Sequence, residues 1–139
     1  MRYAPTLRYA VIGLVFLSTA CTTTITKTKN PEFGIPIDSL AGQINGLVTS
    51  QHVNLDGKEI TTNGMDSSVL EVDILNGKDI PQNDERLKTL GRSIAIDIHN
   101  ALKDKNEYKA FMVLFVKVDS SAGLTKRSWK GCTFSAGQL

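Results

Sequence analysis

The residues of this chain with the most distinctive chemistry are two cysteines, two histidines and one tryptophan. A cysteine thiolate acts as a nucleophile when a neighbouring base or cation lowers its pKa. Cys132, in the segment WKGCTF, is the candidate for that role, but neither His52 nor His99 stands at a spacing typical of a catalytic pair or a metal site. We therefore expect Cys132 to be a small buried residue of a strand, with an intermolecular disulfide and a catalytic thiol as the alternatives. The sequence predicts no metal site and no cofactor.

Cys21 stands in a different context, at the end of an apolar run near the N-terminus. Arg2 and Arg8 lie before the run. Residues 10–17, AVIGLVFL, form an apolar stretch much shorter than the roughly 20 residues that span a bilayer. The residues STAC follow. This segment resembles the lipobox of bacterial lipoprotein precursors. The commonest form has leucine three residues before the cysteine, where this chain has Ser18, with Leu17 one place earlier; looser forms of the motif permit this.

The resemblance implies that residues 1–20 are a cleaved signal peptide and that Cys21 is the site of lipid attachment. Two or three acyl chains anchor a protein stably, whereas one chain binds only marginally. Thr22 is not aspartate, and no acidic run follows Cys21, so the resemblance implies an exported protein at the outer membrane, on its periplasmic face. The alternative is an ordinary cleaved signal peptide with Cys21 as a free thiol.

The charge balance of the rest of the chain excludes one class of function. Arg2 and Arg8 are the only basic residues before Cys21, and all acidic residues lie after it, so residues 21–139 hold 14 basic and 14 acidic side chains. Proteins that bind nucleic acid through its phosphates carry a marked excess of positive charge. The composition therefore predicts no nucleic-acid partner.

The hydrophobic pattern predicts one small domain behind a polar tether. Residues 21–36 comprise the lipidated cysteine and a linker rich in threonine and broken by proline and glycine, and residues 37–139 form the domain. Residues 84–105 have apolar side chains at helical spacing, and residues 109–118 are almost continuously apolar, as in a buried strand. Residues 68–75 alternate, which predicts a strand with Glu71 and Asp73 on a wet face. The fold class is α+β: a two-layer, four-stranded sheet with helices on one face, in the order α-β-β-α-β-β.

Trp129 is the candidate residue for partner contact, because we expect it on an edge strand (125–136) among Lys126, Arg127 and Lys130. The alternative is a tryptophan that covers one end of the core. The sequence favours a small lipid-anchored binding or assembly module of the cell envelope, an accessory subunit whose partners are the membrane, through acyl chains on Cys21, and an envelope protein. A thiol-dependent or hydrolytic envelope enzyme that uses Cys132 is the alternative.

Overall fold

The computed structural model describes residues 22–139, which form one five-stranded sheet, two α-helices and a short C-terminal 3₁₀ helix. In chain order the elements are β1 (Thr24–Thr28), α1 (Ile37–Leu47), β2 (His52–Thr62), β3 (Met65–Leu75), α2 (Asp84–Ala101), β4 (Ala110–Ser121), β5 (Leu124–Ser135) and η1 (Ala136–Gln138). No helix in residues 22–139 is long and apolar enough to cross a bilayer.

The sheet is mixed and its strands follow one another in chain order from β1 to β5. All neighbours pair antiparallel except β3 and β4, which are parallel and are joined through α2. The α+β class is confirmed. The predicted number of strands is wrong, because residues 24–28, which the sequence placed in the tether, pair with β2 as an additional edge strand in which Thr24 lies opposite Thr62.

Both helices pack through a buried stripe that their sequences encode, and α2 also has a side-chain cap. The side chain of Asn83 caps α2 by accepting hydrogen bonds from the backbone amides of Glu85 and Arg86. Leu87, Ile94 and Ile98 recur at helical spacing on the buried face of α2. In α1, Leu40 and Ile44 form the equivalent buried stripe, and Gly42 and Gly46 lie on the exposed side.

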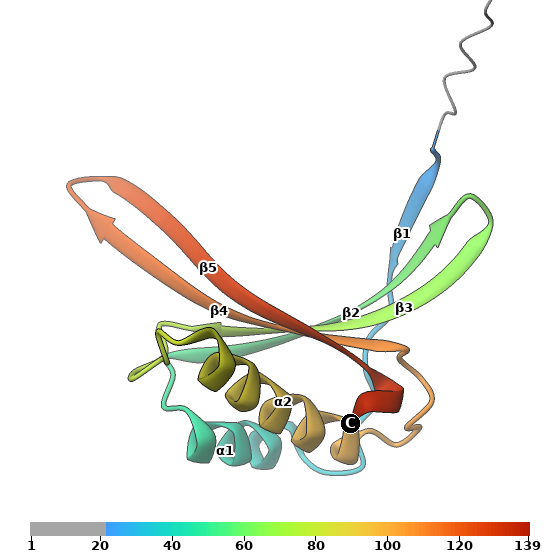
Figure 1. Cartoon of the computed structure of the whole chain (residues 1–139), viewed down its shortest axis with the longest axis horizontal. Coiled ribbons are helices and arrows are strands. Elements are labelled where there is room, and N and C mark those ends of the chain that lie inside the picture. The colour runs from blue at the N-terminus through green and yellow to red at the C-terminus, as the bar shows by residue number, and fades with distance from the viewer. Residues whose placement is uncertain (1–21) are drawn as a thin grey trace, which may run out of the picture.

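The core lies between the helices and one face of the sheet, and Figure 1 shows α1 and α2 on the same side of it. The sheet residues of this core alternate along each strand: Leu70, Val72 and Ile74 in β3, and Phe111, Val113 and Phe115 in β4. The intervening residues face the other way. No helix or second sheet of residues 22–139 covers that side of the sheet, which we call the open face.

The strands extend beyond the helices as two tight hairpins. The β2–β3 turn is Asn63–Gly64 and the β4–β5 turn is Ala122–Gly123, and all four residues have positive φ, as a two-residue hairpin turn requires. The twist of the sheet makes the hairpins diverge, and both rise away from the helices (Figure 1). The open face is therefore concave, with a hairpin on each side.

Candidate functional site: the β4–β5 arm and the open face

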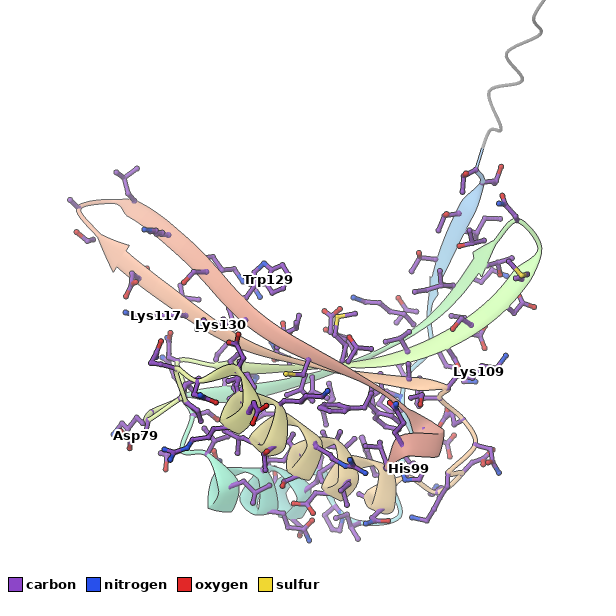
Figure 2. All side chains as sticks on the ribbon, viewed as in Figure 1. Asp79, His99, Lys109, Lys117, Trp129 and Lys130 are labelled. Carbon is purple, nitrogen blue, oxygen red and sulfur yellow. The ribbon has the colours of Figure 1, made fainter. Side chains whose placement is uncertain are left out.

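Trp129 lies on the outermost strand of the sheet, on the projecting part of the β4–β5 hairpin. We call residues 117–130 of this hairpin the β4–β5 arm. The side chain of Trp129 is 67% exposed, and it lies opposite Val116 on the open face (Figure 2). The prediction of an edge-strand tryptophan is confirmed. The alternative, in which Trp129 covers one end of the core, is wrong, because Trp129 is exposed and is not part of the core cluster.

The β4–β5 arm is cationic although the chain after Cys21 is neutral. Lys117, Lys126, Arg127 and Lys130 are all exposed, and Asp119 is the only acidic residue among residues 117–130. Asp119 lies 3.7 Å from the ammonium of Lys117, and β5 itself contains no acidic residue. The outer edge of β5 thus combines an exposed aromatic ring with a local excess of positive charge.

A cleft of about 750 Å³ lies where the β4–β5 arm passes over the loop between β3 and α2. Its lining comes from both segments: Asn76, Gly77, Asp79, Ile80 and Gln82 from the loop, and Phe115 to Asp119 with Ser128 to Lys130 from the arm and its base. The cleft adjoins the carboxyl ends of the parallel strands β3 and β4, the end of such a pair at which ligand crevices commonly form. It is open, and both apolar and charged residues line it.

Asn76 holds this junction together. Its backbone amide donates to the carbonyl of Val116 at 2.8 Å, and its side-chain oxygen accepts from the amide of Val118 at 2.8 Å. Its side-chain nitrogen donates to Oε1 of Gln51 at 2.6 Å. Asn76 follows the last residue of β3 and has a φ of 48°, a left-handed conformation that asparagine adopts more readily than most residues. The base of the β4–β5 arm is thus fixed while its tip projects.

On the open face, Asp73 of β3 is buried where the alternating pattern predicted a wet position. Asp73 is only 8% exposed. The guanidinium of Arg127 reaches across from β5 and donates to its Oδ2 at 3.3 Å. The other oxygen, Oδ1, is buried without a hydrogen-bond partner among the described residues. Burial, reinforced by the nearby charge of Glu71, raises the pKa of the Asp73 carboxyl despite Arg127.

The local sequence does not distinguish Asp73 from Glu71. Asp73 is bonded by Arg127, whose strand β5 is separated from β3 by β4. Glu71 finds its own partner, the ammonium of Lys58, at 2.8 Å. An unsatisfied buried carboxylate oxygen is costly, and a donor from a bound molecule would remove that cost. Asp73, Arg127 and Trp129 together make the open face the second part of the candidate site.

Cys132 lies on the opposite, helix-facing side of β5. It is half-buried against Gly91 of α2, where an added Cβ would lie 3.5 Å from the Cys132 Cβ. Burial raises the pKa of its thiol, and Lys88 only partly opposes this. We expected a small buried residue of a strand, and Cys132 does lie in β5 but is only half-buried. A raised pKa reduces the thiolate fraction, which is the reverse of what a nucleophilic cysteine needs.

The two histidines are far from Cys132 in sequence and differ in environment. His52 is exposed at the start of β2. His99 is half-buried, with its ring edge-on to Phe111 at 5.5 Å between centroids and its Nε2 3.1 Å from the carbonyl oxygen of Lys105. Within residues 22–139, no cluster of three or more His, Cys, Asp or Glu residues is arranged to hold a metal ion.

Cys21 and the signal peptide predicted for residues 1–20 lie outside the described residues. Comparisons of the chain with protein-family models, with curated proteins and with solved structures found no match. The site is therefore interpreted from its own residues.

Proposed function

We propose that this protein is a small lipid-anchored binding or assembly module of the cell envelope, an accessory subunit held at the periplasmic face of the outer membrane by acyl chains on Cys21. The observation that carries the binding role is the exposed Trp129 on the cationic outer edge of β5. The lipobox-like segment that ends at Cys21 supports the location.

The partner that suits this surface is a protein segment with acidic side chains that pairs with the edge of β5. An edge strand presents unpaired backbone groups, and a partner strand can extend the sheet through them. All residues from Leu124 to Gly131 are exposed, and no acidic residue lies in β5. Lys126 and Lys130 would repel a second copy of the same edge and attract acidic side chains, while Trp129 supplies the aromatic anchor typical of binding hot spots.

The alternative, an enzyme that depends on the Cys132 thiol, gains no support from its surroundings. The thiol packs beneath α2, and its pKa is raised by burial. A binding module loses only packing when Cys132 is replaced by alanine, whereas an enzyme of this type loses its activity.

In-cell cross-linking of the full-length protein, followed by purification from membranes and mass spectrometry, tests the proposal. We expect one stoichiometric envelope protein whose cross-linked peptide contains acidic residues. Trp129→Ala should abolish this cross-link. The matched control is Leu47→Ala, which removes another exposed hydrophobic side chain, but on α1.

Recovery of the monomer alone, or a cross-link that survives Trp129→Ala unchanged, would refute the binding role of this edge. The anchor has an independent test. The intact mass of the purified mature protein should equal that of residues 21–139 plus two or three acyl chains, and Cys21→Ser should eliminate the acylated form.

A further inference from the structure

The folded sheet begins close to Thr23, within the segment 21–36 that the sequence predicted to be a polar tether. The backbone amide of Thr23 donates to Oδ1 of Asn63 at 3.2 Å, and the amide of Asn63 donates to the carbonyl of Thr23 at 3.1 Å. Asn63 belongs to the β2–β3 turn. Thr23 is only two positions after Cys21 in the sequence, and a chain spans at most about 3.6 Å per residue. A lipid attached to Cys21 would therefore hold the β2–β3 turn close to the membrane.

This end of the chain and both hairpin tips lie on the same side of the molecule. Figure 1 shows the Thr24 end of β1, the β2–β3 turn and the β4–β5 turn all raised away from the helices, on the side to which the open face looks. A planar surface next to Thr22 would therefore meet the hairpin tips before it met any helix. Such a surface would span the concave open face from one hairpin to the other.

The tips carry the most exposed large hydrophobic side chains of residues 22–139. Met65, directly after the β2–β3 turn, is 72% exposed, and Leu124, directly after the β4–β5 turn, is 78% exposed. Neither side chain belongs to the core. Lys126 and Arg127 follow Leu124 closely, which places cations behind an apolar tip, an arrangement that suits the boundary between acyl chains and phosphate headgroups.

We propose that the hairpin tips rest on the membrane to which Cys21 is anchored, with Met65 and Leu124 in the interface and the open face turned toward the lipid. This inference rests on the proposed lipid attachment at Cys21. The lipid surface is the occupant that the geometry favours, because only Thr22 separates Cys21 from Thr23, which is hydrogen-bonded to the β2–β3 turn. The anchor and the β2–β3 tip lie on one side of the open face and the β4–β5 tip lies on the other, so contact at both sides turns the open face toward the lipid.

The single tryptophan of the chain makes this orientation measurable by fluorescence. In a Trp129→Phe background, Leu124→Trp or Met65→Trp places the only indole at one tip, and Leu47→Trp places it on α1 at the opposite side as the matched control. Each acylated mature protein is reconstituted into vesicles of phosphatidylethanolamine and phosphatidylglycerol with brominated acyl chains, which quench tryptophan only at short range. We expect both tip tryptophans to lose most of their emission and the tryptophan at position 47 to keep nearly all of it.

The intact mass of the same samples separates the two proposals. An acylated protein whose tip tryptophans are quenched no more than the one at position 47 overturns the orientation and leaves the anchor intact. A mature chain without acyl groups overturns the anchor and, with it, this orientation. Circular dichroism of each variant confirms that it is folded, and if one tip variant fails to fold, the other tip supplies the same readout.

Discussion

The attachment of β1 to the core is open to a direct test at Gly57. Gly57 is buried in β2, where its carbonyl accepts a hydrogen bond from the amide of Lys29 at 2.8 Å. The carbonyl of Lys29 in turn accepts from the hydroxyl of Tyr108 at 2.7 Å. A Cβ on Gly57 would overlap both the Lys29 carbonyl oxygen and the Tyr108 hydroxyl, well inside the 3.0 Å below which such contacts are not found. Gly57→Ala must therefore push the end of β1 away from the core.

The size of the effect follows from these contacts. Displacing Lys29 by about 1 Å weakens two hydrogen bonds, each with a net value of about 1 kcal/mol. Overpacking of a close-packed site adds about 1–3 kcal/mol. We therefore expect Gly57→Ala to lower the free energy of unfolding by about 3–5 kcal/mol. For a domain of this size that corresponds to a fall in the melting temperature of roughly 10–20 °C.

Thermal unfolding followed by circular dichroism measures the change, with Gly42→Ala as the matched substitution. An added Cβ at Gly42 meets no atom within 4 Å, and the residue lies on the exposed side of α1. Alanine there should stabilise the helix by about 1 kcal/mol, so the two substitutions should move the melting temperature in opposite directions. Equal shifts, or a Gly57→Ala protein as stable as the wild type, would refute the close docking of β1.

Two further predictions concern the titratable groups of the sheet. Burial raises the pKa of the Asp73 carboxyl above its unfolded value, so the folded state binds this proton more tightly, and ionised Asp73 opposes folding at neutral pH until the pH falls through the raised pKa. Urea unfolding from neutrality to mild acid should therefore show the wild type gaining stability relative to Asp73→Asn. A constant difference in stability between the two proteins would contradict this role of Asp73. Burial also raises the pKa of the Cys132 thiol, so iodoacetamide at neutral pH should alkylate Cys132 more slowly in the folded protein than in the urea-unfolded chain. Equal rates of alkylation would show that the thiol is accessible and ionised in the folded protein.

The elements that the sequence predicted well are those whose signal is local. The helical spacing of Leu87, Ile94 and Ile98 sets α2, and alternation and continuous apolarity set β3 and β4. Each of these patterns arises because the apolar side chains of the element pack into the same hydrophobic core. The parallel pairing of β3 and β4 agrees with the helix between them, since a crossover of this kind normally joins parallel strands.

The errors concern contacts between residues distant in the chain. The threonine-rich β1 reads as a polar linker because every residue in it is exposed, and only its pairing with β2, from Thr24 opposite Thr62, makes it a strand. Asp73 reads as a wet residue because the side chain that covers it, Arg127, comes from β5. The exposure of Trp129 could be expected from an edge strand, but the cleft beside it depends on the loop between β3 and α2, which Asn76 fastens to β4.

The short path from Thr23 to the sheet also has a mechanical consequence. The hydrogen bonds between β1 and β2 are perpendicular to the strands, so a pull on Thr22 along the axis of β1 loads them in shear, together rather than one after another. At the C-terminal end of β1, the hydrogen bonds of Lys29 with Gly57 and Tyr108 must also break before β1 can detach from β2. The segment that the sequence predicted to be a polar linker is in this structure a hydrogen-bonded strand, through which a force on Thr22 reaches the hydrophobic core.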